Sequence, residues 1–137
     1  MKTFFDSSAF AKRYVDEPGS DAVEAACLAA TDLGLCVICV PEIVSAFNRR
    51  LRERMLRPAD YKLMKERLVE DVSDATIVDL TPAVIKEAVV MLETSVLRAA
   101  DALHVAAAVV WGAEWFVSAD RRQLAAARRA GLRTKAV

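Results

Sequence analysis

Apolar residues in this chain follow two alternating patterns. Short apolar runs predict strands at residues 2–5, 35–40 and 115–117, an alternating run predicts one at residues 76–80, and residues 132 onward could add an edge strand. Between these runs, apolar side chains recur every three or four residues, which predicts helices over residues 8–14, 21–30, 41–57, 58–68, 82–92, 99–111 and 120–130. Because one or two helices separate successive strands, crossovers must connect them. The pattern therefore predicts an α/β fold in three layers, a mostly parallel sheet of four to five strands with helices on both faces.

Proline and glycine residues mark the expected ends of several helices. Pro41 stands at the predicted start of the third helix, where its missing N–H group costs nothing. Gly34 follows the second predicted helix, and we interpret it as a helix stop. Gly112 and Gly131 follow two later helices in the same way.

The composition is that of a single packed domain spanning residues 1–137. Hydrophobic residues make up 55% of the chain, and Gly and Pro contribute only four each, which excludes a disordered or fibrous protein. Lys plus Arg and Asp plus Glu both number 19, so the net charge is zero and the chain is not a strongly basic nucleic-acid binder. A polyanion would have to meet a local patch of positive charge.

No targeting or membrane segment is expected. No apolar stretch approaches the roughly 20 residues of a membrane span, and an acid interrupts the first apolar run too early for a signal peptide. We therefore expect a cytoplasmic protein whose three cysteines are reduced thiols. Cys36 and Cys39 form a CxxC pattern, which we interpret as two buried hydrophobes on opposite sides of a strand.

Four acidic residues are the candidates for chemistry. Asp6, Glu42 and Asp120 each follow a predicted strand. Asp101 lies in the first turn of the most apolar helix, where an unpaired carboxylate would be costly. Since ligands bind at the carboxyl ends of parallel strands, we expect these side chains to converge at one edge of the sheet. Taken singly, however, Asp6 could be a helix cap, Glu42 could complement a helix dipole, and Asp120 with Gln123 resembles a capping box.

Carboxylates that converge repel one another. Two unit charges about 4 Å apart interact with roughly 4 kcal/mol at an effective dielectric of about 20, so a cation or a proton must relieve the repulsion. An all-oxygen ligand set suits Mg²⁺, with Mn²⁺ as a substitute, better than Zn²⁺. Mg²⁺ typically binds one or two carboxylates together with phosphate oxygens of a substrate, and it can lower the pKa of a bound water. The four acids therefore indicate phosphodiester chemistry.

Four segments carry a resemblance to a known family. They are Phe-Phe-Asp6-Ser-Ser-Ala-Phe, Pro-Glu42-Ile-Val-Ser-Ala-Phe, Arg-Ala-Ala-Asp101-Ala-Leu-His and Phe-Val-Ser-Ala-Asp120-Arg-Arg-Gln-Leu. In order and spacing they resemble the signatures of PIN-domain ribonucleases, and more narrowly those of VapC-type toxins of bacterial toxin–antitoxin pairs. The resemblance implies a PIN-like fold and a Mg²⁺- or Mn²⁺-dependent endoribonuclease. It also implies an RNA substrate, a homodimer, and a cognate antitoxin that inserts a segment near the active site.

The resemblance also implies a role for each acid. Asp6 and Asp101 match direct metal ligands. Glu42 matches the acid that helps to hold the metal or to position water, and Asp120 matches the last acid, which completes the metal pocket.

Two further features of the last motifs follow from the same resemblance. Ser8 and Ser118 match hydroxyl positions that support the site. Some family members carry a further acid just after the last one, whereas Arg121 and Arg122 stand there in this chain, which weakens the case for a second metal ion.

The histidine and the arginines near these motifs admit more than one role. His104, the only histidine, lies three residues after Asp101 on the same helical face, and we expect a packed or supporting residue rather than a metal ligand. Basic runs at residues 49–57 and 121–129 are either solvated helix faces or tracks for RNA phosphates. Arg98 and Lys12 are further candidates for the rim of the site.

Two other enzyme classes fit poorly. A phosphotransferase with Asp6 as nucleophile needs a second Asp two residues later, where this chain has Ser8. A response-regulator receiver fits poorly, since it needs an acidic pair beside its first strand and a late Lys, whereas the late positions here are Asp120-Arg-Arg. The remaining alternative is a non-catalytic α/β interaction module whose acids serve as helix caps, each worth about 0.5–2 kcal/mol. For a nuclease, we expect Asp6→Asn or Asp101→Asn to abolish RNA cleavage while leaving the metal-free fold intact or more stable.

Overall fold

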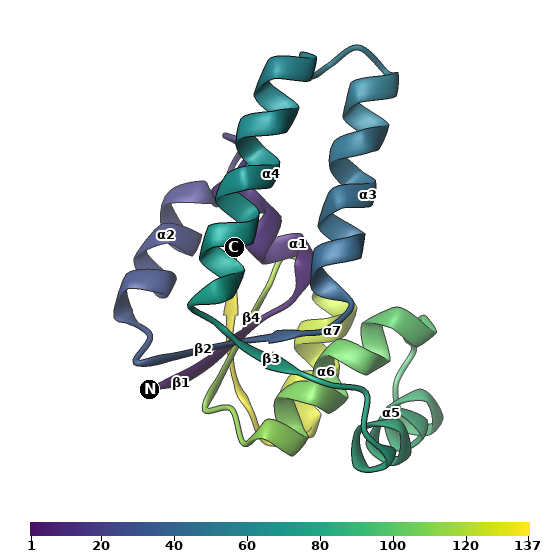
Figure 1. Cartoon of the computed structure of the whole chain (residues 1–137). Coiled ribbons are helices and arrows are strands. Elements are labelled where there is room, and N and C mark those ends of the chain that lie inside the picture. Colours follow the sequence, from purple (N-terminus) through teal and green to yellow (C-terminus); the bar gives the residue numbers. More distant parts are fainter.

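A computed structural model describes all 137 residues of the chain, in which five strands alternate with helices (Figure 1). In chain order the elements are β1 (Lys2–Phe5), α1 (Ser7–Phe10), the 3₁₀ turn η1 (Ala11–Arg13), α2 (Ser20–Ala29), β2 (Asp32–Cys36), α3 (Cys39–Arg52), α4 (Pro58–Ser73), β3 (Thr76–Val78), α5 (Pro82–Thr94), α6 (Ala99–Trp111), β4 (Trp115–Ser118), α7 (Arg121–Arg129) and β5 (Arg133–Ala136). Every element predicted from the apolar pattern is present, although some begin or end elsewhere.

The five strands form one sheet in the order β3-β2-β1-β4-β5, and all neighbouring pairs are parallel. The predicted α/β fold is confirmed, and the sheet is entirely rather than mostly parallel. The C-terminal run, residues 133–136, is an edge strand paired with β4. Because β1 is central and parallel to its neighbours, the residues that follow β1 and β4 meet at one edge of the sheet.

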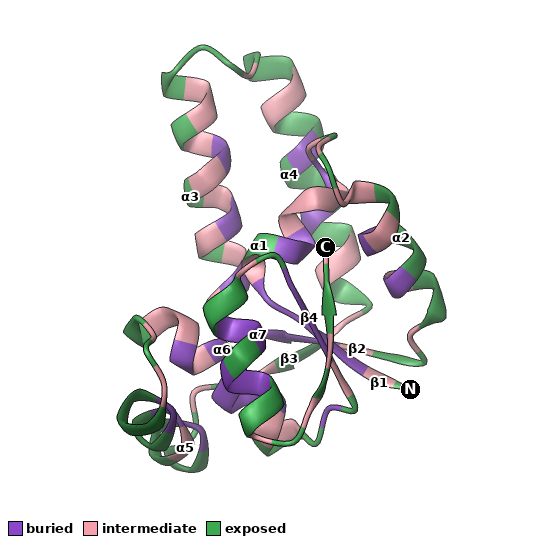
Figure 2. Cartoon of the chain, turned by 180° about the vertical axis from the view of Figure 1, so that it is seen from behind, coloured by how far each residue is buried: buried purple, intermediate pink, exposed green.

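Apolar residues cover both faces of the sheet, because successive side chains of a strand point to opposite sides. Phe4 and Phe116 face one side and stack with their ring centroids 6.0 Å apart. Phe5 and Val117 face the other side. Helices α5, α6 and α7 cover the first face, and α1 to α4 cover the second. Figure 2 shows the buried residues concentrated in β1, β4 and α6, so the helix predicted to be buried on most sides is indeed the centre of one layer.

The second strand lies earlier in the sequence than predicted. β2 covers Asp32–Cys36 rather than residues 35–40, and Gly34 lies inside it instead of ending a helix. The ring of Trp111 packs so closely on Gly34 that an added Cβ atom would lie only 2.6 Å from it. The glycine therefore allows α6 to approach the sheet. A contact between residues so distant in sequence leaves no mark in the local pattern.

Helix α3, which carries Glu42, also begins earlier than predicted, at Cys39 rather than Pro41. Cys36 ends β2 and belongs to the apolar layer of α5 to α7, whereas Cys39 belongs to the opposite layer. The two thiols are buried on opposite sides of the sheet, as expected, although only one of them lies in a strand. Burial raises the pKa of the Cys39 thiol to about 12, so that thiol stays protonated.

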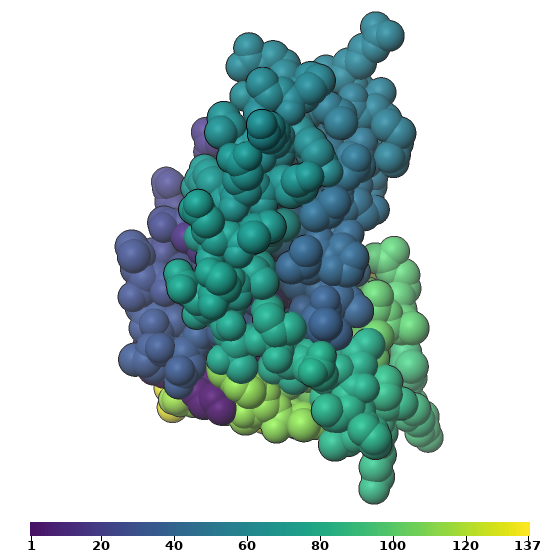
Figure 3. Space-filling model, viewed as in Figure 1, coloured from purple at the N-terminus to yellow at the C-terminus, as the bar shows by residue number.

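Helices α3 and α4 form a hairpin that projects from the sheet and its helices (Figure 1). The space-filling view shows the hairpin standing above the rest of the molecule, with α5 at the opposite end (Figure 3). Met55, in the turn of the hairpin, is largely exposed. None of the helices combines the length and the apolar character that crossing a membrane requires.

Candidate active site

A polar cavity of about 170 Å³ lies where β1 and β4 end and four helices begin. Asp6 follows β1, and Asp120 directly precedes α7. Glu42 and Asp101 lie in the first turns of α3 and α6. None of the lining residues is apolar; they are Asp6, Ser7, Ser8, Glu42, Arg98, Asp101, His104, Asp120 and Gln123. The fold thus brings all four acids singled out in the sequence into one cavity.

Asp6 is fully buried and accepts hydrogen bonds from every side. The backbone N–H of Ala9 donates to its Oδ1 at 2.9 Å, so Asp6 caps α1, as its simpler interpretation predicted. Its Oδ2 accepts the hydroxyl protons of Ser8 at 2.7 Å and Ser118 at 2.8 Å. The same oxygen accepts from Nε2 of Gln123 at 2.9 Å. Burial raises the pKa of Asp6 above its usual value, although the hydrogen bonds from Ala9, Ser8 and Ser118 oppose the shift.

The two serines that contact Asp6 are themselves held by the backbone. Ser8 Oγ accepts the N–H of Ala119 at 3.1 Å, and Ser118 Oγ accepts the N–H of Asp120 at 2.9 Å. Each hydroxyl therefore uses a lone pair toward the loop after β4 and directs its proton toward Asp6. The serine positions suggested by the family resemblance thus orient the first acid and tie α1 to β4.

Glu42 lies in a more open part of the cavity, beside a serine and the histidine. Its Oε1 accepts the hydroxyl proton of Ser7 at 2.7 Å and lies 2.5 Å from Nε2 of His104. Burial opposes ionisation of Glu42, but the hydrogen bonds from His104 and Ser7, with the charges of His104 and Arg98, outweigh it and lower the pKa of Glu42. Glu42 is therefore a carboxylate at neutral pH. Its Oε2 accepts no hydrogen bond from the protein.

His104 and Ser7 both contact Glu42, but only His104 could be predicted from the sequence. His104 is buried and contacts Glu42, which agrees with a supporting role, while its Nδ1 has no partner. The spacing of three residues from Asp101, which places His104 on the same helical face, was the sequence signal for this role. Ser7 was missed, because its partner Glu42 lies far away in the sequence and nothing local distinguishes it from Ser8.

Asp101 caps no helix and lies at the edge of the cavity. Its Oδ2 is 3.4 Å from Nε of Arg98, whose side chain is exposed. Its Oδ1 accepts from Nε2 of Gln123 at 3.2 Å. The cost of a carboxylate in an apolar helix is thus offset by a cation on the solvent side and an amide on the buried side.

Asp120 is the N-cap of α7. Its Oδ1 accepts the N–H groups of Arg122 at 2.8 Å and Gln123 at 3.1 Å. The capping-box interpretation is wrong for the side chain of Gln123, which does not return to the N–H of Asp120. That N–H already donates to a serine, so the amide turns inward and bridges Asp6 and Asp101 instead.

Arginines border the acid cavity on its open side. A wider hollow of about 500 Å³ adjoins it, and only charged residues line that hollow: Arg98, Asp101, Asp120, Arg121 and Arg122. Three of these, Arg98 and the two acids, also line the acid cavity. A negative cavity with a positive rim can hold a cation inside and a polyanion outside.

The other basic residues lie elsewhere. Arg128, at the far end of α7, donates to Thr134, and Lys12 donates to the carbonyl of Pro18. The expectation that Lys12 reaches the rim is therefore wrong. The run at residues 49–57 lies at the end of α3 opposite to the end that carries the site, and in the following turn.

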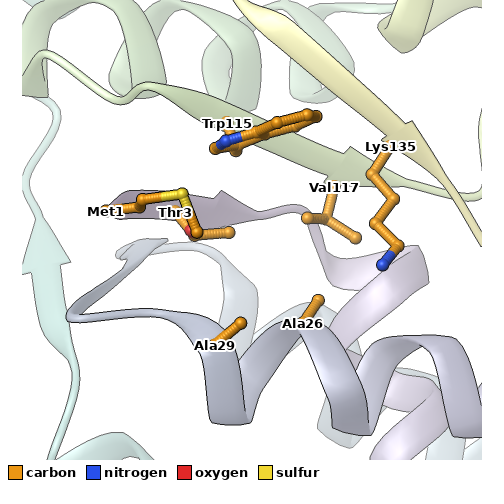
Figure 4. Close-up of a pocket in the computed structure, with 7 residues that line it drawn as sticks. All are labelled: Met1, Thr3, Ala26, Ala29, Trp115, Val117 and Lys135. Atoms are coloured by element: carbon orange, nitrogen blue, oxygen red, sulfur yellow. The ribbon is translucent and has the colours of Figure 1, made fainter.

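A second cavity, of about 150 Å³, lies between α2 and the sheet (Figure 4). Its lining is mostly apolar, and it comprises Met1, Thr3, Ala26, Ala29, Trp115, Val117 and Lys135. It contains no acid and none of the residues singled out in the sequence. Its chemistry does not suit a metal ion.

The donors of the acid cavity suit a divalent ion, although they do not form a ready-made cage. Carboxylate oxygens are the ligands that Mg²⁺ and Mn²⁺ prefer. No three Asp, Glu, His or Cys side chains are grouped so that they could hold an ion as they stand. Between Asp6 and Asp101 lies the amide nitrogen of Gln123, whose hydrogens relieve the repulsion that a cation would otherwise relieve. The ligand set therefore fits the ion once this amide moves.

Comparison with known proteins identifies similar sequences and folds. The family model described as PIN domain matches residues 3–129. No curated protein sequence gives a significant match.

Among solved structures, VapBC2 from Rickettsia felis bound to a promoter DNA fragment has a TM-score of 0.71 at 12% identity, covering 100% of this chain and 99% of that chain. VapC20 from Mycobacterium tuberculosis, described as a Sarcin-Ricin loop cleaving toxin, has a TM-score of 0.70 at 13% identity, with 95% of each chain covered. A toxin-antitoxin complex from Klebsiella pneumoniae has a TM-score of 0.69 at 14% identity, with 90% of each covered. At these identities the likeness shows the fold.

Proposed function

The chain belongs to the PIN domain family, and we propose that it is a metal-dependent endoribonuclease that acts as the toxin of a toxin–antitoxin pair. One observation carries the proposal. Four carboxylates from distant parts of the sequence line a single cavity, and three arginines border its mouth. VapC20, which shares the fold, is described as a Sarcin-Ricin loop cleaving toxin, and this is consistent with a nuclease that acts as a toxin.

Asp6, Asp101 and Asp120 are the residues that would hold the ion. Oδ2 of Asp120 accepts no hydrogen bond from the protein, and Oδ2 of Asp101 is engaged only by an exposed arginine. Bound Mg²⁺ supplies Lewis acidity and lowers the pKa of a coordinated water. The buried position of Asp6 and the donors Ala9, Ser8 and Ser118 hold this side chain in place directly after β1, which keeps the reacting geometry constant.

Glu42 is suited to accept a proton from the attacking water. Its lowered pKa keeps it ionised, and its free Oε2 can accept a hydrogen bond. His104 and Ser7 hold the other oxygen and so orient the carboxylate. In this assignment His104 is a positioning residue for Glu42.

The arginine rim explains how a chain of zero net charge can bind RNA. Arg98, Arg121 and Arg122 line the hollow beside the acids. Their guanidinium groups can contact phosphates on either side of the scissile bond and neutralise the charge that develops during cleavage. Binding of this kind depends strongly on salt.

The alternative, a non-catalytic module whose acids are caps, accounts for half of the acids. Asp6 and Asp120 do cap α1 and α7. Glu42 lies in the first turn of α3, as its dipole interpretation predicted, but neither Glu42 nor Asp101 accepts a capping hydrogen bond, and their partners include His104 and Arg98. A module of caps gives no reason for these two carboxylates to lie in the same cavity.

The toxin role requires partner proteins, and an exposed apolar stripe favours them. Ile85, Val89 and Leu92 lie on one face of α5, each more than 40% exposed, and Val96 follows at 77%. Such a stripe is a typical protein contact surface. We propose that the chain forms a homodimer and binds a cognate antitoxin in the cytoplasm. The molar mass in solution and co-purification with the product of the neighbouring reading frame test these two interactions.

Cleavage of total bacterial RNA by the purified chain tests the central activity. We expect cleavage with Mg²⁺, none with EDTA, and recovery when Mn²⁺ is added, because the acids need the ion to act on a phosphodiester. Sequencing of the new 5′ ends would identify the RNA target. Cleavage that persists in EDTA would contradict the metal-dependent mechanism.

A further inference from the structure

Gln123 is the member of the cavity whose position the proposed reaction does not explain. Its side chain is 3% exposed, and Nε2 donates to Oδ2 of Asp6 at 2.9 Å and to Oδ1 of Asp101 at 3.2 Å. The nitrogen of the amide, rather than its oxygen, therefore faces the two carboxyl groups. As a consequence, Oε1 is buried without any hydrogen-bond partner.

Oδ2 of Asp6 has no acceptor position left for a metal ion. A carboxylate oxygen offers about two lone-pair positions. Three donors already reach Oδ2, from Ser8, Ser118 and Gln123, while the N–H of Ala9 reaches Oδ1. An ion that binds Oδ2 must therefore displace one of its donors.

Gln123 is the donor that can yield. The N–H of Ala9 belongs to the backbone of α1, and the hydroxyls of Ser8 and Ser118 are oriented by N–H groups of the loop after β4. The amide of Gln123 turns about its last side-chain torsion, which has a broad and roughly two-fold energy profile. Because the side chain is buried, the amide cannot move into solvent. A rotation of half a turn exchanges its nitrogen and oxygen in place.

We propose that Gln123 is a switching ligand of the metal site, an inference that rests on the proposed function. In the metal-free chain its N–H groups take the place of a cation between Asp6 and Asp101. When Mg²⁺ or Mn²⁺ enters, the amide rotates and presents Oε1 to the ion. Carbonyl oxygens of amide side chains are accepted ligands of hard divalent cations. The site thus contains a neutral side chain that satisfies the acids in one state and the ion in the other.

The chain provides an internal control for a spectroscopic test. Gln123 and Asn48 are its only two side-chain amides. Asn48 donates to the carbonyl of Val44 at 2.8 Å and lies 3.1 Å from the hydroxyl of Tyr61, in the α3–α4 hairpin and outside the site. A ¹H–¹⁵N spectrum of the full chain should therefore contain two side-chain NH₂ pairs.

The test is a titration of the EDTA-treated full chain with MgCl₂, followed by NMR and by calorimetry. We expect the protons of Gln123 Nε2 to shift upfield as they lose the carboxylates, and its ¹³Cδ to shift downfield as the carbonyl meets the ion. The Asn48 pair should stay in place. If calorimetry detects Mg²⁺ binding while the Gln123 signals do not move, the inference is wrong and the proposed function stands. If neither Mg²⁺ nor Mn²⁺ binds, both are wrong.

A pair of variants gives a second, independent measurement. Gln123→Leu removes the amide from the site, and Asn48→Leu removes an amide that is hydrogen-bonded elsewhere. We expect Gln123→Leu to weaken Mg²⁺ binding about tenfold, because buried leucine neither supplies an oxygen nor admits a water in its place. Asn48→Leu should bind Mg²⁺ like the unmodified chain. Equal or tighter binding by Gln123→Leu would show that the amide is a bystander or an obstacle, and would overturn its assignment as a ligand.

Discussion

Two of the cavities in the molecule have nearly equal volumes and opposite chemistry. The acid cavity measures about 170 Å³ and has no apolar lining residue, whereas the cavity beside α2 measures about 150 Å³ and is mostly apolar (Figure 4). Volume alone therefore does not identify the functional one. The acid cavity lies where parallel strands lead into helix N-termini, which bring backbone N–H groups and favour carboxylates.

The hydrogen bonding of the two cavities differs as much as their lining. In the acid cavity, Asp6 is held by four donors from three segments of the chain. Both cavities contain buried polar atoms without a partner, the indole N–H of Trp115 in the apolar cavity and Nδ1 of His104 and Oε1 of Gln123 in the acid cavity. What distinguishes the acid cavity is a hydrogen-bond network built from residues that are distant in sequence.

Among variants that compare the two cavities, Asp101→Asn in the acid cavity should cause the largest loss of RNA cleavage. This change should reduce RNA cleavage at least about 100-fold, because it removes a charged metal ligand. Its unfolding free energy should change by less than about 1 kcal/mol, since the ion pair with exposed Arg98 contributes little. Cleavage rates and thermal unfolding of the same preparation measure both.

The matched control lies in the apolar cavity. Ala29 is exposed at its edge, and Ala29→Leu adds apolar volume there without touching an acid. We expect cleavage by this variant to equal that of the unmodified chain. A loss of cleavage comparable to that of Asp101→Asn would break the distinction between the cavities.

Substitutions of the arginines that border the acid cavity should have a smaller effect, and it should appear in RNA binding. The double change Arg121→Ala and Arg122→Ala should weaken RNA binding and lower the slope of log affinity against log salt by about 0.7 for each phosphate that is no longer neutralised. Arg128→Ala, on the same helix but bonded to Thr134, is the control. An unchanged salt slope in the double variant would remove these arginines from the RNA path.

Asp6→Asn should destabilise the fold, contrary to what the sequence alone suggested. Removing a repelling charge was expected to leave the fold intact or more stable. The structure reverses the sign, because the new amide nitrogen would face donors from Ala9, Ser8, Ser118 and Gln123. An unsatisfied buried donor costs about 1–3 kcal/mol. Chemical denaturation in EDTA measures it, and a variant as stable as the unmodified chain would refute this account of the network.

The smallest expected effect is a pH dependence from Glu42. Its pKa is lowered in the folded chain, so its contribution to stability is present above its unfolded pKa of about 4.3 and is lost as pH falls through the lower folded value. The unmodified chain should therefore be more stable than Glu42→Gln at pH 7, and this difference in unfolding free energy should shrink as the pH falls toward 3. Urea unfolding of both chains across this range tests the sign, and a deficit that grows toward low pH would contradict it.

The sequence was sufficient for the fold and for the acids, but not for their partners. Apolar periodicity is a local property, so it predicted the elements and the parallel sheet. The predicted position of β2 was wrong, because Gly34 is required by its contact with the ring of Trp111 in α6 and does not end a helix. The role of Ser7 and the inward orientation of the Gln123 side chain were not predicted for the same reason. Their hydrogen-bond partners are set by tertiary contacts and not by spacing along the chain.

Calorimetric titration of Mg²⁺ into the metal-free chain and into Asp101→Asn tests the central claim most directly, because it measures the ion rather than the reaction. We expect saturable binding to the unmodified chain and binding at least about tenfold weaker to the variant. No binding to the unmodified chain, or equal binding to both, would contradict the claim that these carboxylates form a metal site.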